Sequence, residues 1–243
     1  MSFQWGTSLK IKILVLCHHL FFIIGLLFFD AKHLAVALLS YFIFGKIGGE
    51  IALHRYFSHK SFKTTPAVDK FLRLVSIGAG LGSPISWAAT HRLHHRHEDS
   101  VGDPHSPRLQ SPWNVWLTYW KPFVVPQKLI SDLSKDPLHR MIHNHYFLLH
   151  IALWIPSLIL FPTYFPYIFS FPCIYGFHLA GAVNVLGHSP EIRNVLWLNF
   201  FGLGDALHLN HHKHPNASST AGANLLEFDL SGWIIRTFCR VDK

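Results

Sequence analysis

Near the middle of the chain, His91, His94 and His95 have the residue type and spacing of metal ligands. On a helix of about 3.6 residues per turn, the third and fourth residues after His91 fall about 60° and 40° on either side of it. The three imidazoles therefore leave the helix on one face. The same spacing recurs near the C-terminal end, at His208, His211 and His212. A chain with 20 histidines in 243 residues should contain far fewer than one such pattern by chance, so we interpret both as metal-binding.

Two further groups of side chains could add ligands. His54 and His59 are five residues apart, which is about 140° around an ideal helix. Both can point the same way only if the helix ends between them, so we expect this pair where a helix ends. Asn184 and His188 are four residues apart and share one helix face. If all these groups serve one centre, the fold must bring four distant segments together.

The number and type of these side chains narrow the choice of metal. Imidazole suits zinc, copper and iron. Nine histidines exceed the four ligands of a tetrahedral zinc site, and two methionines with three scattered cysteines argue against soft copper, an iron–sulfur cluster or a disulfide framework. Two metals with mostly nitrogen ligands satisfy the count. Iron would also activate oxygen, and a pair of structural zinc ions is the alternative.

The composition indicates a membrane protein. Half of the residues are hydrophobic and 14% are charged, against about 25% charged in a typical soluble domain. The net charge of +8 would suit anionic lipid headgroups, phosphorylated substrates or an acidic electron donor. The same excess also follows from the positive charge that cytoplasmic loops of membrane proteins collect. We expect the lipid bilayer as a partner and no nucleic acid.

Hydropathy predicts an all-α integral membrane fold with four transmembrane helices. The expected spans are residues 13–29, 34–53, 146–162 and 166–186. Lys and Arg lie before the first span and after the second, so both termini and every histidine group should be cytoplasmic. The groups would then lie on a cytosolic helical cap carrying a histidine-rich site for two metals. Residues 1–243 would form this single membrane domain.

One more apolar run, from Leu74 to Thr90, should not cross the membrane. A crossing there would place His91 on the opposite side from His54, and the glycines and Pro84 favour irregular backbone. We therefore interpret it as a re-entrant or interfacial segment. The polar region that follows would be anchored at the interface by tryptophans, namely Trp113, Trp116 and Trp120.

Several polar residues close to these features need separate interpretations. His18 and His19 lie inside the first span, where we expect neutral rings facing neighbouring helices. His97 is six residues after His91, about 240° around the helix, and should point away from the ligand face.

Lys46 lies eight residues and Glu50 four residues before His54, where the first histidine pair begins, and both are on the second span. Glu50 is four residues before His54 and could orient its ring. Lys46 is equally close to Glu50 on the other side. The spacing favours a plain Lys46–Glu50 ion pair on the helix surface.

Together, these groups resemble the membrane fatty-acyl desaturases of the Δ9 type, which include the stearoyl-CoA desaturases. The motifs that carry the resemblance are His54–His59, His91–His95, Asn184-x-x-x-His188 and His208–His212. It extends to Trp87, Asp99, Asp103-Pro104-His105, Gly204-Asp205 and Glu227-Phe228-Asp229. It covers about residue 45 to the C-terminus, and four boxes in this order are highly specific.

The resemblance implies a centre of two iron ions. Its ligands would be His54, His59, His91, His94, His95, His188, His208, His211 and His212, with Asn184 acting through a bound water. Such enzymes use O2 and two electrons to introduce a cis double bond into a long acyl chain. The protein would supply a dry, narrow tunnel that fixes which carbons meet the metal. Three carboxylates are candidates to accept the outer N–H of ligand imidazoles, namely Asp99, Asp103 and Asp205.

The chain also departs from the animal acyl-CoA enzymes. Ala89 and Thr90 stand where those enzymes carry an Arg-Asp pair associated with CoA recognition. This version resembles plant and bacterial relatives, so the substrate is acyl-CoA or acyl-lipid, and the bacterial inner membrane is favoured over the endoplasmic reticulum. Glu50 stands before the first histidine pair, where such enzymes usually have a small or polar residue. No His-Pro-Gly-Gly signature of a fused cytochrome b5 is present, so a separate ferredoxin or cytochrome b5-type donor would supply electrons.

Two other functions compete with this interpretation. A histidine-rich di-iron hydroxylase or alkane monooxygenase would share the metal and O2 but leave a hydroxyl group. Asn184-x-x-x-His188 and Asp103-Pro104-His105 argue against it. A heme-binding or metal-transporting membrane protein is the second alternative. A transporter should hold its ligands at the bilayer midplane, whereas these groups lie at expected helix ends.

Overall fold

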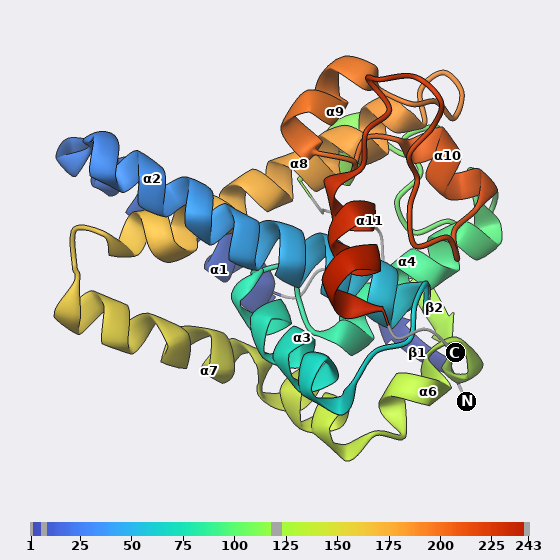
Figure 1. The fold of residues 1–243 in the computed structure, drawn as a ribbon. Helices are drawn as coiled ribbons and strands as arrows, with labels where there is room; N and C mark the ends of the chain where they lie inside the picture. The colour runs from blue at the N-terminus through green and yellow to red at the C-terminus, as the bar shows by residue number, and fades with distance from the viewer. Residues whose placement is uncertain (1, 6–8, 118–122, 241–243) are drawn as a thin grey trace.

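The computed structural model describes residues 2–5, 9–117 and 123–240, and most of these residues are helical. Long helices extend to one side of the molecule, while short helices and two strands gather at the opposite end (Figure 1). β1 and α11, near the two ends of the chain, both lie at that second end (Figure 1). We call it the cap. Trp120, one of the expected interface residues, lies outside the described ranges.

The first half of the chain contributes β1 (Ser2–Trp5), α1 (Leu9–Gly25), η1 (Leu26–Phe28), α2 (Ala31–Ser40), η2 (Tyr41–Ser58), α3 (Pro66–Gly78), α4 (Pro84–His97) and α5 (Pro112–Trp116). The second half contributes β2 (Phe123–Pro126), η3 (Gln127–Ile130), α6 (Ser131–Ser134), α7 (Pro137–Leu160), η4 (Pro166–Ser170), α8 (Phe171–Gly187), α9 (Leu196–Gly202), α10 (His208–Lys213), α11 (Leu230–Ile234) and η5 (Ile235–Cys239). β1 and β2 form a two-stranded antiparallel sheet, so the expected all-α fold is wrong in this one detail.

Within the described residues, three helices are long and apolar enough to cross a membrane by length and composition. They are Leu9–Phe28, Ala31–Ser58 and Pro166–Gly187. The first of these helices begins before the predicted span 13–29, and the second ends after the predicted span 34–53. The fourth expected span lies in α7 but is not among the three, because polar residues such as His145 and His150 dilute its apolar surface.

The apolar run from Leu74 to Thr90 is broken, as the sequence predicts. α3 ends at Gly78, and α4 begins after Ser83, whose hydroxyl caps the helix by accepting from the Ser86 N–H at 3.2 Å. Between them, Gly80 and Gly82 have φ values of 73° and 99°, which side chains rarely tolerate. This turn sets the start and direction of α4, the helix that carries His91, His94 and His95.

The long helices pack through aromatic residues and paired imidazoles. Leu14, Trp154 and Phe165 belong to one buried apolar cluster that joins α1, α7 and the segment before α8. His18 Nε2 lies 3.0 Å from His150 Nε2, which confirms that His18 faces a neighbouring helix. The same holds for His19, whose Nε2 lies 3.0 Å from Nε2 of His178 on α8.

At the end opposite the cap, the α1–α2 turn meets the α7–α8 turn. The Tyr167 hydroxyl donates to the Gly25 carbonyl at 2.6 Å. The rings of His33 and Tyr164 stack with centroids 4.4 Å apart. The two turns therefore lie at the same end of the helical bundle.

Candidate metal centre

The cap brings all nine expected histidine ligands into two adjacent clusters. Four ring nitrogens within 4.8 Å of one another belong to His54, His59, His91 and His211. A second group of the same tightness comprises His94, His188, His208 and His212. His95 Nε2 lies 3.1 Å from His91 Nε2 and 2.8 Å from His211 Nε2, so we count it with the first group. We call these five and four residues the first and second clusters.

The first cluster depends on the unusual winding of η2. This segment is a π-helix, and the His59 N–H donates to the His54 carbonyl at 3.2 Å. Such an i→i+5 bond brings residues five apart close to one another on one helix face. The helix ends at Ser58, between His54 and His59 as expected, although its winding is π and not α. His54 Nε2 reaches His211 Nε2 at 3.1 Å, and His59 Nε2 reaches His91 Nε2 at 2.7 Å.

Carboxylates fix the orientation of rings in both clusters. Glu50 Oε2 lies 2.7 Å from Nδ1 of His54 in the first cluster. In the second cluster the Nδ1 atoms face Asp103 at 2.9 Å from His94, Asp99 at 2.9 Å from His188, and Glu98 at 2.6 Å from His212. An ionised carboxylate can only accept, so each of these Nδ1 atoms carries the proton. The Nε2 atom of each ring is then a bare lone pair.

These lone pairs fit a bound metal ion. His94 Nε2 and His212 Nε2 face each other at 3.4 Å, and both rings have a carboxylate at Nδ1. Neither Nε2 atom has a proton to donate, so two lone pairs at this separation repel unless a cation lies near both. Neutral imidazole with a carboxylate on its outer N–H is also the usual form of a metal-binding histidine.

Burial favours the neutral form of five of the clustered histidines. Burial and the neighbouring ring of His54 lower the pKa of His59 to about 2. Burial, followed by the effect of neighbouring rings, also holds the pKa values of His91, His94, His208 and His211 well below the ordinary value. Since only a neutral imidazole can ligate a metal, the rings are ready to bind at neutral pH.

A cavity of about 240 Å³ extends from the clusters into the helical bundle. His54 and His91 of the first cluster line it, together with His208 of the second and Asn184. Away from the histidines its walls are mostly apolar or glycine, including Gly45, Gly49, Leu81, Gly176, Phe177 and Leu179. An extended apolar chain in this cavity would reach both clusters.

Comparison with known proteins identifies the family of the chain that carries these clusters. The fatty acid desaturase family model matches residues 31–221, which include all nine clustered histidines. The chain belongs to the fatty acid desaturase family. It is therefore an oxidoreductase that introduces a double bond into a fatty acyl chain, as the motifs predict.

Relatives cover most of this desaturase. The sn-1 stearoyl-lipid 9-desaturase of Anabaena variabilis is 31% identical over 217 residues, which are 84% of this chain and 79% of that protein. The sn-2 palmitoyl-lipid 9-desaturase of Nostoc sp. is 27% identical over 86% of this chain and 79% of the relative. The acyl-CoA C20 Delta5-desaturase of Anemone leveillei is 29% identical over 86% and 71%. The family generally uses two irons, and the two clusters offer sites that could hold metal.

The desaturase differs from the sequence-based expectations in its carboxylates. Asp99 and Asp103 accept from imidazoles, whereas Asp205 lies against the Lys46 ammonium, which also donates to the Gly202 carbonyl at 2.8 Å. The favoured Lys46–Glu50 pair is therefore wrong, since Lys46 points to Asp205. The four-residue spacing of Lys46 and Glu50 takes account only of contacts within one helix, whereas Asp205, the partner of Lys46, lies 159 residues away in sequence.

One partner carboxylate was missed by the sequence analysis. Glu98 accepts from His212, a ligand on a helix 114 residues away in sequence. The available signal was its position three residues after His95, the last residue of the second histidine box. His97, by contrast, belongs to neither cluster, and its ring packs against the turn at Gly102.

Proposed function

We propose that this desaturase holds two iron ions in the two clusters and uses O2 and two electrons on an acyl chain bound in the adjoining cavity. The proposed ligands are His54, His59, His91, His95 and His211 for one iron, and His94, His188, His208 and His212 for the other, with Asn184 acting through water. The observation that carries this proposal is the pair of neutral, lone-pair-bearing imidazole clusters at the end of an apolar cavity. Residues 1–243 act as one membrane domain.

The protein's own contribution is orientation and exclusion of water. Bound iron supplies the oxygen-dependent chemistry that removes hydrogen from an unactivated methylene. Carboxylates at Nδ1 hold rings such as His54, His94 and His188 in one tautomer. The apolar walls hold the chain extended, and Trp87, which lines the cavity and stacks near His91 with centroids 6.3 Å apart, limits where the chain passes the first cluster.

We infer a lipid-linked acyl chain as the substrate and a Δ9 position for the double bond. Two of the relatives described above are named as lipid 9-desaturases. Ala89 is buried and Thr90 lines the cavity, so neither position offers the charged pair expected for CoA. One relative is named as an acyl-CoA enzyme. Acyl-CoA is therefore the substrate against which the proposal is tested.

We infer four membrane spans, with α7 as the fourth. The cap end of α7 is tied to α3 by an ion pair between Arg73 and Asp136 at 2.9 Å. Its other end leads to Tyr164, which stacks on His33 beside the α1–α2 turn. If α1 and α2 cross the bilayer, α7 runs between the same two ends and crosses with them. The clusters and both termini are then cytoplasmic, in a bacterial inner membrane.

A separate protein supplies the electrons in this proposal. The cap carries the positive charge of the long segment after η2, including Arg96 and Lys128. Such a surface suits an acidic one-electron carrier of the ferredoxin or cytochrome b5 type.

The decisive experiment expresses the chain in a desaturase-deficient bacterium and locates double bonds in its lipids by mass spectrometry. A cis double bond at carbon 9 of lipid-linked chains is expected. Purified protein is then offered the same chain as a lipid or as its CoA ester, with O2 and a reduced ferredoxin. Turnover of the CoA ester alone contradicts the lipid assignment, and a hydroxylated product contradicts desaturation. A Soret band in the purified protein would indicate heme in place of the two irons.

A further inference from the structure

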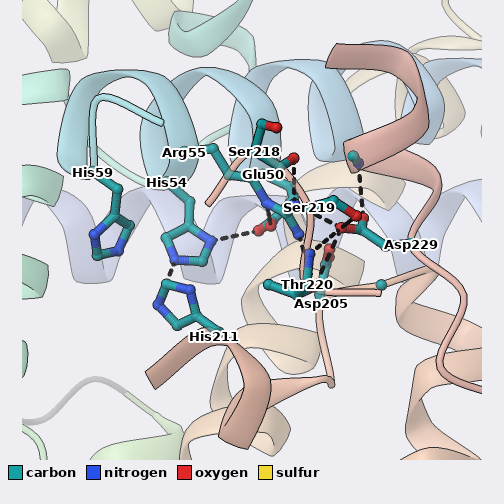
Figure 2. A network of polar contacts seen from close by, with 12 residues as sticks. Glu50, His54, Arg55, His59, Asp205, His211, Ser218, Ser219, Thr220 and Asp229 are labelled. Atoms are coloured by element: carbon teal, nitrogen blue, oxygen red, sulfur yellow. Dashed lines mark hydrogen bonds and ion pairs between the residues drawn. The ribbon is translucent and has the colours of Figure 1, made fainter. Parts of the chain in front are cut away.

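A buried ion-pair network connects the first cluster to the C-terminal part of the chain. Glu50 uses both carboxylate oxygens: Oε2 faces His54 Nδ1 at 2.7 Å, and Oε1 accepts from Arg55 Nε at 2.7 Å (Figure 2). A second nitrogen of Arg55 donates to Asp229 Oδ2 at 2.7 Å. The relative exposures of Glu50, Arg55 and Asp229 are 8%, 2% and 7%. All three charges are therefore removed from water and depend on one another.

Asp229 is itself held rigidly. Its Oδ2 accepts from the Thr220 N–H at 2.8 Å, and its Oδ1 accepts from the Gly232 N–H at 2.8 Å, at the start of α11. Arg55 also donates to the Ser218 carbonyl at 3.1 Å. Figure 2 shows this C-terminal loop beside η2, on the far side of Glu50 from the cluster. The loop thus fixes the guanidinium of Arg55 in place.

We propose that Glu50 is a positioning residue for His54, and that Arg55 and Asp229 set the place of its carboxylate. The loop at residues 218–232 would then contribute to metal affinity at the first cluster without touching the metal. This inference rests on the proposed two-iron function. A carboxylate on the outer N–H orients a ligand imidazole, keeps Nε2 unprotonated and makes it more basic. Arg55 prevents Glu50 from turning away, because one oxygen is committed to each partner.

Lys46 cannot replace Arg55 in this role. Its ammonium is fully buried and is engaged by Asp205 and by the Gly202 carbonyl, 2.8 Å away. A buried carboxylate without a paired cation is costly, and Arg55 is the cation that pairs with Glu50, with Nε 2.7 Å from Oε1. The local helix spacing alone would have assigned Glu50 to Lys46 and missed this link.

The effect should be confined to one metal. Among the described residues, Glu50 is the one carboxylate that accepts from a ring of the first cluster. Three carboxylates serve rings of the second cluster, namely Asp99, Asp103 and Glu98. Loss of Glu50 or Asp229 should therefore weaken the first site and leave the second intact.

The test compares single and double variants of the purified full-length protein. Iron content is measured against increasing concentrations of a ferrous chelator, and Mössbauer spectra follow the two irons separately. We expect Glu50→Gln to weaken retention of one iron by about 10-fold to 100-fold. Asp229→Asn should weaken the same iron by a smaller factor. The double variant should be no worse than Glu50→Gln alone, because both changes act through one link.

Two matched carboxylate variants serve as controls. Asp103→Asn removes the charge of the carboxylate that accepts from His94 and should weaken the other iron. Asp69→Asn, a partner of Arg73 outside both clusters, should change neither iron. If Glu50→Gln does not fold, the Mössbauer parameters of the first iron in Asp229→Asn provide the test, since a purely structural role would leave them unchanged in folded protein.

The outcomes separate this inference from the proposed function. Wild-type protein that binds no iron contradicts the two-iron function itself. Wild-type protein with two irons, together with unchanged retention in Glu50→Gln, overturns only the positioning role. Equal weakening of both irons, or additive losses in the double variant, also overturns it.

Discussion

The cavity walls allow a direct test of where the acyl chain lies. Gly176 is buried on α8, eight residues before Asn184 and therefore about 12 Å from it along the helix axis. A Cβ at this position would meet only Leu81 Cδ1, at 3.9 Å, among atoms within 4 Å. The Cβ of a side chain here is therefore in ordinary contact distance, and we expect the Val side chain in Gly176→Val to enter the cavity that Gly176 lines. It occupies space that the far end of a long acyl chain would otherwise fill.

The size of the effect follows from the volume added. Val introduces three carbon atoms, which displace about three methylene groups of the chain. At about 0.8 kcal/mol per buried methylene, discrimination against the longest substrate is about 2.4 kcal/mol, or roughly 50-fold in kcat/KM. A chain three carbons shorter should react almost normally. Both irons should remain, because Gly176 lies far from the histidine ligands along α8.

The assay offers the purified variant a mixture of saturated chains of different length and measures the desaturated products by mass spectrometry. The control is Ile174→Val, on the same helix but outside the cavity lining, which should leave the product profile unchanged. If Gly176→Val retains iron and the wild-type preference for long chains, the chain does not pass Gly176. The assignment of this cavity to the substrate would then be refuted.

Three other predictions use iron content, topology and pH. His94→Ala should strip iron and abolish turnover, whereas His97→Ala should keep both irons and most activity; equal losses by metal analysis would contradict the ligand assignment. Reporter fusions after Asp30 and after Lys63 should report opposite sides of the membrane, and agreement between them would exclude the four-span topology. Burial raises the pKa of Asp132, but bonds from Arg92 and Lys60 outweigh this effect and lower it to below the ordinary value. Its stabilisation is fully present above the unfolded pKa of about 3.9 and is lost as pH falls from there through the lower folded pKa, so the melting temperature of Asp132→Asn should be reduced at pH 7 and the difference from wild type should narrow below about pH 4.

The sequence predicted those parts of the site that depend on ideal helix geometry. The spacing of His91, His94 and His95 placed three rings on one face, and α4 carries them so. The same reasoning placed His54 and His59 at a helix end, which η2 confirms by ending at Ser58, but it assumed α-helical winding, and η2 is a π-helix. No local spacing rule distinguishes that winding from an α-helix. The stabilising contacts come from tertiary packing, which a single chain segment does not reveal.

Long-range pairing explains the other differences. Lys46 and Glu50 are ideally spaced for an ion pair, yet they do not contact each other. Lys46 binds Asp205, and Glu50 binds His54 and Arg55. Because all these groups are buried, burial decides which partner each charged side chain takes. On an exposed helix a local pair contributes a few tenths of a kcal/mol. In the interior, leaving Asp205 or Arg55 unpaired costs several kcal/mol, so the more distant partners prevail.

The way the two boxes divide their ligands explains why this spacing suits a centre with two metals. On one helix, residues i and i+4 lie about 40° apart, while residue i+3 lies about 100° from i+4. In α4, His91 and His95 accordingly enter the first cluster and His94 enters the second. α10 follows the same rule with the clusters exchanged: its i and i+4 histidines join the second cluster, and its i+3 histidine, His211, joins the first. Each box therefore gives two ligands to one site and one to its neighbour. A single-metal site would leave one ring of every box pointing aside, so the repeated spacing and the paired clusters have one geometric cause.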